Sequence, residues 1–188
     1  MAVTANLTAG QVLNASTVNT YMINSGLVYV TQVTVGSGVS SVNITSCFSS
    51  TYDNYVLSYS GLAVSNSGVP LTLKLLSGTT PTTSGFYGNT YYTSTGVGGS
   101  ISNAATSNAA FTEGPSVTTA YLNAGVVQIQ NPFLAQATQF QYSGNDNTFW
   151  RLGSSYHNAN TSYNGIQLVP WTGTFTGGTI TIYGYRKG

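Results

Sequence analysis

The side chains that could carry out acid–base, nucleophilic or metal chemistry are few and far apart in this 188-residue chain. Three acids are present, Asp53, Glu113 and Asp146, with one histidine, His157, and one cysteine, Cys47. A pair of carboxylates could hydrolyse a glycosidic bond, but two of the three acids would have to converge in the fold. Asp53 and Asp146 both have asparagine neighbours, a composition typical of turns, where Asp bonds its own backbone. We therefore expect no catalytic residue.

We also expect structural roles for the single histidine and the single cysteine. A catalytic triad would need His157 beside a serine and an acid, and the sequence contains no nucleophile-elbow pattern. One imidazole and one thiol are too few for a protein-built zinc site. Asn145-Asp146-Asn147 is too short a run of oxygen ligands to indicate calcium. Cys47 cannot form an intrachain disulfide, and its position next to Phe48 indicates a buried small hydrophobe. We expect no metal and no cofactor.

Aromatic side chains in or beside Asn- and Ser-rich segments are the more informative feature. Tyrosine combined with serine, glycine and asparagine is the composition of adaptable binding loops, and aromatic faces stack on sugar rings. The alternative is that these rings fill the core and faces of a β-sheet. We expect some of them to form a receptor-facing or intersubunit surface. The candidates are Tyr87, Tyr91, Tyr92, Trp150, Tyr156 and Tyr163.

Composition restricts the class of protein. Only 4% of the residues are charged, against about 25% in ordinary soluble proteins, while 41% are hydrophobic. The chain is therefore not disordered by composition, and uncharged polar side chains must cover its surface. Such a surface suits a protein held in an assembly, or one that contacts sugars, better than a freely diffusing enzyme. The four cations are scattered and the net charge is +1, so we expect no nucleic-acid partner.

A period of two in hydrophobicity from residue 27 onward predicts strands to position these side chains. We expect one domain over residues 27–188, all-β, with the architecture of a β-sandwich or jelly roll. Gly177-Gly178 is expected to form a turn before the closing strand. Residues 77–112 are interpreted as a loop, an aromatic strand near 86–95 and a second loop. The nine or ten expected strands are 27–35, 39–45, 54–63, 71–75, 86–95, 121–130, 138–143, 148–156, 165–169 and 179–185.

Residues 1–26 have a different pattern, which predicts an N-terminal arm containing a short helix. Thr8 and Gln11 have the spacing of a capping box, and Asn14 can cap a second short helix. A helix of about ten residues is marginal alone, so its apolar stripe needs a partner. That partner is either the β-domain of the same chain or another chain, in which case the arm is an anchor or a trimerisation element. The residues assigned to this role are Val12, Leu13, Val18, Tyr21 and Met22.

No stretch of the sequence predicts insertion into a membrane or secretion. No apolar run approaches the length of a transmembrane helix. The first residues, MAVTANLTAG, have neither the cationic region nor the long apolar region of a secretory signal. We therefore expect a protein that is made in the cytoplasm and then stays in an assembly or leaves in a particle.

Three segments carry a resemblance to a known family. They are LTAGQVLNASTVNTYMINSGLVYV near the N-terminus, SSVNITSCFSSTYDNYVLSYSG in the first third, and the closing GGTITIYGYRKG. Together they resemble small virion structural proteins of tailed bacteriophages, in which an AGxVLxA…NTY arm precedes a β-domain with a YGYRKG-like end. The resemblance implies a tail-fibre, receptor-binding or head-decoration component, usually trimeric. It implies a location in the virion and brings no catalytic residue with it.

Three functions follow from these observations. The first is a non-enzymatic virion protein of tail-fibre or receptor-binding type, contacting itself as a homotrimer, other virion proteins and a host surface polysaccharide. In this case the loops near residues 77–112 and 144–164 are expected at the projecting tip. The second is a capsid decoration or head-fibre protein, which the short chain favours because no shaft is visible. The third is a carbohydrate-binding module or a glycan hydrolase, and the shortage of acids argues against the hydrolase.

Overall fold

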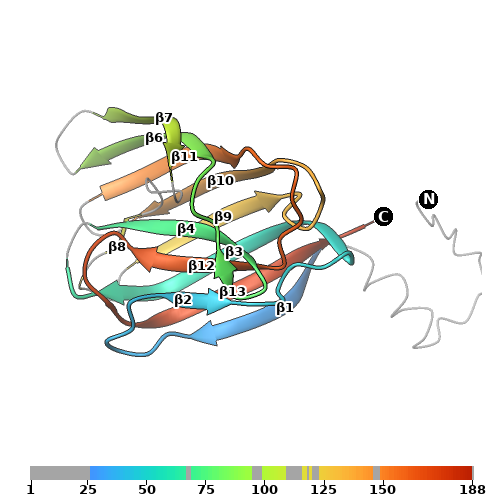
Figure 1. Ribbon diagram of the computed structural model, residues 1–188. Helices are drawn as coiled ribbons and strands as arrows, with labels where there is room; N and C mark the ends of the chain where they lie inside the picture. The colour runs from blue at the N-terminus through green and yellow to red at the C-terminus, as the bar shows by residue number, and fades with distance from the viewer. Residues whose placement is uncertain are drawn as a thin grey trace, which may run out of the picture.

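A computed structural model describes residues 26–66, 69–94, 99–108, 116–117, 119, 123–145 and 149–187. Within these residues the chain forms two antiparallel sheets, one in front of the other in the view of Figure 1. The expected all-β sandwich is therefore confirmed. The expected helical arm, including Val12, Leu13, Val18, Tyr21 and Met22, lies outside the described residues.

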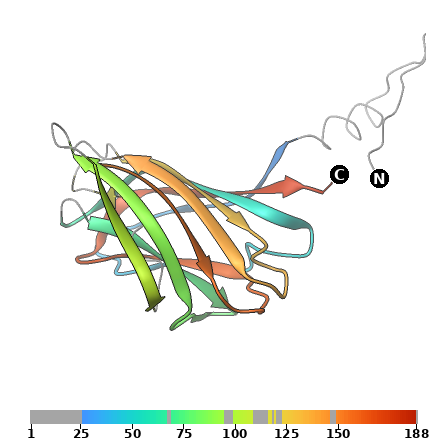
Figure 2. The same cartoon turned by 90° about the horizontal axis from the view of Figure 1, so that it is seen from above.

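The larger sheet contains eight described strands, and its twist is visible in Figure 2. All of its neighbouring strands run antiparallel. In spatial order these are β1 (Leu27–Thr34), β13 (Phe175–Arg186), β3 (Tyr52–Val64), β9 (Ala124–Gln130), β10 (Thr138–Asn145), β11 (Phe149–His157), β6 (Phe86–Ser94) and β7 (Ser100–Asn108).

The smaller sheet contains five described strands. Its order is β2 (Val42–Ile44), β12 (Gly165–Pro170), β4 (Val69–Ser77) and β5 (Thr80–Pro81), with β8 (Ser116–Val117) also paired to β4. Successive strands alternate between the two sheets from β1 to β4 and again from β11 to β13. This alternation of successive strands between two sheets is the pattern of a jelly roll. The larger sheet extends beyond that unit through β10, β11, β6 and β7.

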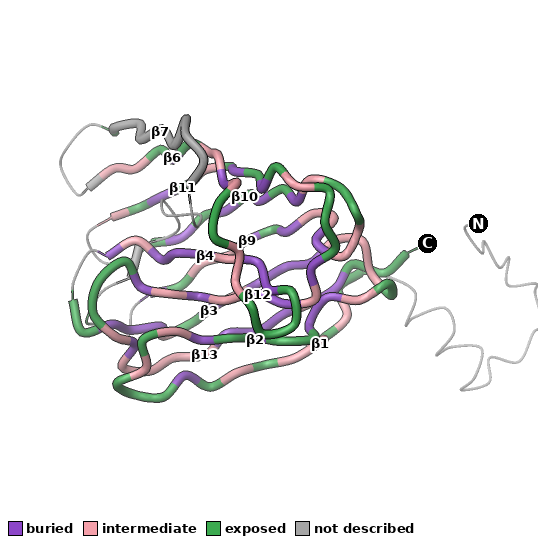
Figure 3. The backbone as a smooth tube through the Cα atoms, viewed as in Figure 1, coloured by how far each residue is buried: buried purple, intermediate pink, exposed green. Residues whose placement is uncertain are grey.

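The core lies between the two sheets and is built from alternate residues of each strand, shown in purple in Figure 3. Leu57 on β3 and Ile182 on β13 contribute from the larger sheet, and Leu73 on β4 and Leu168 on β12 from the smaller one. All four side chains are completely buried. Each such side chain stabilises the fold by roughly 1.5–3 kcal/mol relative to leaving it in water. The period of two read from the sequence therefore identifies the buried face correctly.

The sandwich has two distinct ends. At the end where β1 begins and β13 finishes, the turns are joined by hydrogen bonds such as Tyr163 N to the Pro132 carbonyl oxygen, 2.8 Å. The turns after β2, β4, β9 and β11 lie at this end. The turns after β1, β3 and β12 lie at the opposite end, where the amide of Trp171 donates to the Pro70 carbonyl oxygen. Residues 78–85 and 158–164 are parts of the two segments expected at the projecting tip. They lie together at the end where β13 finishes, since the Asn158 amide donates to the Gly85 carbonyl oxygen at 2.8 Å.

Two local expectations need correction. Gly177-Gly178 is not a turn, because it lies inside β13, where the register against β3 shifts on both sides of Gly177. Gly178 has φ +120°, and a Cβ there would lie 2.4 Å from the Leu62 Cα, so glycine permits this close approach of two strands. Residues 100–108, expected as loop, form β7 as the edge partner of β6.

The number of strands is also larger than the sequence predicts. The described residues form thirteen strands rather than nine or ten, and the additional ones are β5, β7 and β8. β5 and β8 contain two residues each, too few to leave a periodic signal. β7, with the sequence SISNAATSN, is rich in Ser, Asn and Ala, which are not typical strand residues.

Candidate functional site

The outer face of the eight-stranded sheet, away from the core, carries uncharged polar, aromatic and aliphatic side chains in the rows described below. Its rows follow from the strand register. One row runs through Tyr29, Tyr183, Val56, Gln128, Gln141, Ser154 and Asn89. The neighbouring row runs through Gln32, Thr181, Ser58, Val126, Ser143, Leu152 and Tyr91. Neither row contains an ionisable side chain other than tyrosine.

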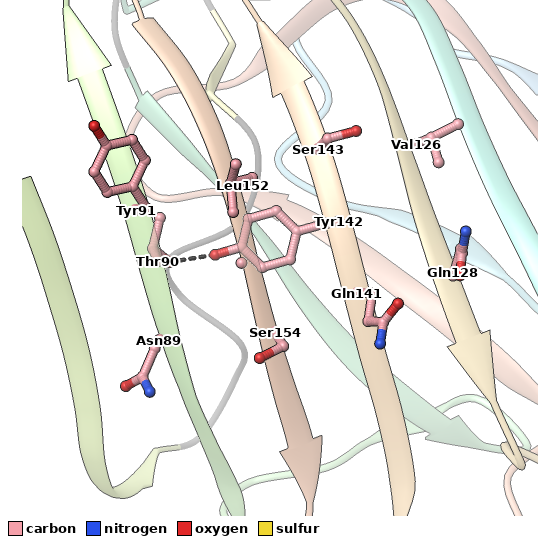
Figure 4. Close-up of a pocket in the computed structure, with 11 residues that line it drawn as sticks. Asn89, Thr90, Tyr91, Val126, Gln128, Gln141, Tyr142, Ser143, Leu152 and Ser154 are labelled. Atoms are coloured by element: carbon pink, nitrogen blue, oxygen red, sulfur yellow. Dashed lines mark hydrogen bonds between the residues drawn. The ribbon is translucent and has the colours of Figure 1, made fainter. Parts of the chain in front are cut away.

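Three adjoining hollows follow β9 across this face, and we call them together the outer trough. The first has a volume of about 580 Å³ and is bordered by Gln128, Gln141, Leu152 and Tyr91 (Figure 4). The second, of about 600 Å³, extends past Ala124 to Trp150 and shares Val126 and Ser143 with the first. The third, of about 280 Å³, reaches Tyr185 and shares Gln128 with the first. No described residue that lines the three hollows carries a charge at neutral pH.

The trough exists because small side chains separate two groups of large ones. Ser58 and Ser60 on β3 lie beside Ala124 on β9, and Ser143 lies on β10. On one side, Tyr29 and Tyr183 pack edge to face with ring centroids 6.4 Å apart. On the other side, Tyr91 and Trp150 pack in the same manner at 6.2 Å. The sheet is therefore low along β9 and high at both flanks.

Glycines beneath the trough let inner-face rings lie against the sheet. The Tyr142 ring lies over Gly153, where an added Cβ would overlap the phenol, and its hydroxyl is hydrogen-bonded to the Thr90 hydroxyl (Figure 4). Gly125 accommodates the Tyr59 ring in the same way. Two buried tyrosines thus support the strands that carry the trough, which favours a fixed shape.

The amides of Gln128 and Gln141 in the trough are available to a ligand. Figure 4 shows the amides of Gln128 and Gln141 on neighbouring strands, with Asn89 and Ser154 farther along the same row. Within the described part of the chain, neither glutamine side chain makes a hydrogen bond to another residue. Each amide offers two donors and one acceptor oxygen. The trough therefore presents both donors and acceptors without a net charge.

The predicted aromatic contact residues divide between the two faces of the sheet. Tyr91, Trp150 and Tyr156 are on the outer face, 38%, 44% and 42% exposed. Tyr87 lies there too, with its ring stacked on Tyr156 at a centroid distance of 5.3 Å. Tyr91 and Trp150 line the trough, whereas the Tyr87–Tyr156 pair lies farther along β6 and β11.

Two of the predicted contact residues have other surroundings. Tyr92 points to the inner side of β6, and the Arg151 guanidinium lies 5.3 Å from its ring centroid. Tyr163 is only 5% exposed and packs against His157, so the expectation of a surface contact is wrong for this residue. Its position in an Asn- and Ser-rich segment suggested a surface loop, but that segment folds over the end of the core.

The side chains considered for catalysis are dispersed in the described structure. Asp53 pairs with Lys187 at 2.7 Å, near the C-terminus. His157 is buried between Phe86 and Tyr163, and burial lowers the pKa of its imidazole. Burial raises the pKa of Cys47 to about 12, and its thiol points to the Ile44 carbonyl oxygen at 3.3 Å, as expected of a buried small side chain. Among the described residues, no three of His, Cys, Asp and Glu gather as metal ligands would. Glu113 and Asp146 lie outside the described residues.

Sequence reasoning missed the residues at the centre of the trough. Gln128, Gln141 and Val126 lie within predicted strands. They were not among the predicted contact residues, which were chosen from aromatic side chains in polar segments. The available signal was the alternation itself, since it places Gln128 opposite the buried Val127 and Ile129 and therefore on the outer face. Which strands lie side by side could not be read from that pattern.

Comparisons with known proteins gave no family for this chain. In the part of the chain that the structure describes, no helix has the length and hydropathy needed to cross a bilayer. A scan against protein-family models, a search of curated proteins and a search of solved structures each gave no match.

Proposed function

We propose that the protein is a non-enzymatic structural component of a bacteriophage virion, of the tail-fibre or receptor-binding type. The observation that carries this proposal is the uncharged outer face with its trough and aromatic flanks. A face rich in amides, hydroxyls and exposed rings suits contact with a host surface polysaccharide or with other virion proteins. The resemblance of the N-terminal, early and closing segments to small virion proteins supports the same assignment.

The arrangement of the ionisable groups supports a binding role over catalysis. The described residues that line the trough include no carboxylate, imidazole or thiol, and the Asp53 carboxylate is engaged by Lys187. Hydrolysis of a glycosidic bond needs two carboxyl groups facing each other across the substrate. A carbohydrate-binding module therefore remains a candidate outside the virion, and a glycan hydrolase is disfavoured.

A capsid decoration or head-fibre protein is the second candidate within the virion. The described residues form one sandwich without a shaft, and a receptor-binding fibre usually needs a shaft to project from the particle. Homotrimeric assembly fits either location, because the edge strands β1 and β7 of the larger sheet could then be covered by neighbouring copies.

Cryo-electron microscopy of purified particles of the phage that encodes the chain tests these proposals. Peptides of the chain should be detected in the particles by mass spectrometry, and density for the sandwich should be found on the tail. Density on the capsid would select the decoration protein instead. Absence of its peptides from particles, with the protein present in the lysate, would refute the virion assignment.

A further inference from the structure

We propose that the outer trough binds a neutral glycan chain lying along β9. This inference deepens the proposed function and rests on it for the origin of the glycan, a bacterial surface. The chemistry of binding rests on the trough alone.

The shape of the trough suits an extended chain rather than a compact molecule. Its three hollows adjoin along β9 from Gln130 to Ala124. At a rise of roughly 3.3 Å per residue, this segment spans about 20 Å. Tyr185 borders the hollow at one end and Trp150 the hollow at the other. An oligosaccharide of several sugar residues has these proportions.

The polar lining matches the hydroxyl groups of sugars. A hydroxyl is both donor and acceptor, and an amide side chain can satisfy both functions at once. Gln128 and Gln141 are directly opposite each other on β9 and β10, and Ser143 follows on the outer side of β10. These side chains come from adjacent strands of a sheet, so their spacing is fixed before the ligand binds. Pre-organisation of this kind reduces the entropic cost of binding.

The aromatic flanks supply flat apolar surfaces for the C–H faces of the sugar rings. Trp150 and Tyr91 are about two-fifths exposed and hold each other in an edge-to-face pair. A rigid pair of this kind loses little conformational freedom when a ligand packs on it. We expect Trp150 to be the main anchor, because its ring is the larger and lines the hollow near the end of the trough.

The lining argues against other occupants. An acidic glycan or a nucleic acid needs cations, and no Lys or Arg is found among the described residues that line the trough. A second copy of the sheet would bury the amides of Gln128 and Gln141 unmatched unless its own polar side chains lay directly opposite them. Burial of amides without partners costs free energy. The hollow along β9 would also have to be filled by a matching ridge, and the outer face of the described sheet is itself low there.

Binding of the full-length protein to a glycan array is the primary test. The array carries neutral probes, namely linear glucans, mannans, galactans, rhamnans and N-acetylglucosamine oligomers, beside acidic polyuronates and polysialate. We expect at least one neutral probe to bind. Trp150→Ala should then weaken its affinity by about tenfold, and Gln141→Ala by about three- to tenfold. Trp171→Ala is the matched control, since Trp171 is exposed outside the trough, and it should leave the affinity unchanged.

A pair of charge variants tests whether the ligand is neutral. Gln141→Glu and Gln141→Lys introduce opposite charges at one position of the trough. A neutral glycan should be weakened to a similar extent by both, whereas an acidic ligand would bind the lysine variant more tightly. Circular dichroism confirms that all variants are folded.

Several results would overturn the inference. They are failure of every neutral probe to bind, opposite responses of the two charge variants, and equal loss of affinity in Trp171→Ala. Release of subunits by Trp150→Ala, measured by light scattering, would identify the trough as an interface between copies. Failure of the virion assignment is a separate result, because it is measured by the presence of the chain in particles.

Discussion

At the scale of single residues, His157 has surroundings that link stability to pH. Its Nε2 lies 2.9 Å from the Ser84 carbonyl oxygen, which can only accept, so this nitrogen carries the hydrogen. Its Nδ1 then accepts from the Tyr163 hydroxyl at 3.3 Å. Burial lowers the pKa of the imidazole below its usual value of 6.5. The folded protein therefore holds His157 neutral where the unfolded chain would already be protonated.

The sign of the pH effect follows from this difference. Below pH 6.5 His157 binds a proton in the unfolded chain but stays neutral in the folded chain. The free energy of unfolding should therefore decrease as the pH falls, until the pH reaches the lower pKa of the folded state. Urea unfolding midpoints near pH 7.5 and pH 5 measure this decrease in stability. His157→Gln should cost about 1–3 kcal/mol at neutral pH and show a smaller decrease on acidification. The Asp53–Lys187 ion pair is present in the wild-type protein and in the variant, so its contribution to the pH dependence is the same in both. An unchanged pH dependence in the variant would contradict the prediction.

Residue types alone predicted the role of Cys47 but not that of Tyr163. A lone cysteine beside a phenylalanine is most often buried, and composition is sufficient to indicate it. Tyr163 and Tyr156 both lie in polar segments, yet one is 5% and the other 42% exposed. The difference in exposure arises from two contacts of Tyr163. Its amide donates to the carbonyl oxygen of Pro132, which is distant in sequence, and its hydroxyl bonds to the buried His157. No local pattern contains that information.

At the scale of elements, the irregular strand β13 depends on Gly178. This residue combines φ +120° with a backbone so close that a Cβ would lie 2.4 Å from the Leu62 Cα. Gly178→Ala should therefore destabilise the protein by about 3 kcal/mol or more, from backbone strain and from overlap together. Gly38→Ala is the matched control, because Gly38 has φ +77° with no atom within 4 Å of the added Cβ. It should cost only about 1–2 kcal/mol.

Chemical denaturation of the two glycine variants measures this difference. Equal free energies of unfolding for Gly38→Ala and Gly178→Ala would show that the close approach of β13 to β3 is relaxed at little cost. The bulge would then be a tolerated irregularity rather than a requirement of the fold.

Strands with a regular alternation were predictable, and those held by their neighbours were not. Leu71, Leu73 and Leu75 alternate with smaller or polar residues, and all three are completely buried in β4. β7 contains no such alternation and forms because β6 offers an unpaired edge. Gly177-Gly178 has the composition of a turn, and only the pairing of β13 with both β1 and β3 keeps it in a strand.

At the scale of the whole molecule, the trough could not be predicted because it depends on the order of strands in the sheet. Gln128 and Val56 become neighbours through the pairing of β9 with β3, across more than seventy residues of chain. Gln128 and Gln141 meet through the pairing of β9 with β10. The sequence indicates which side chains are outward, whereas the pairing decides which of them form one surface. The proposed binding face is therefore a property of the topology.

The division of the chain at residue 26 leads to a prediction for assembly. β1 begins at Leu27, and the described core residues run from Val35 to Ile182, with partly buried Val30 and Val33 packed against them. Deletion of residues 1–26 should therefore leave a folded sandwich, with a thermal midpoint within about 4 °C of the full chain. If these residues anchor the protein, the truncated chain should be absent from particles.

Complementation of a phage that lacks the gene tests the anchor. The full-length chain supplied from a plasmid should enter particles at the normal amount, and the truncated chain, produced at the same level, should not. Normal incorporation of a folded truncated chain would exclude the anchor and place the particle contact on the sandwich itself. Loss of the circular dichroism spectrum on truncation would instead show that the arm belongs to the domain. Because glycan binding depends on the trough, a folded truncated protein should retain it, so the two functions should separate at residue 26.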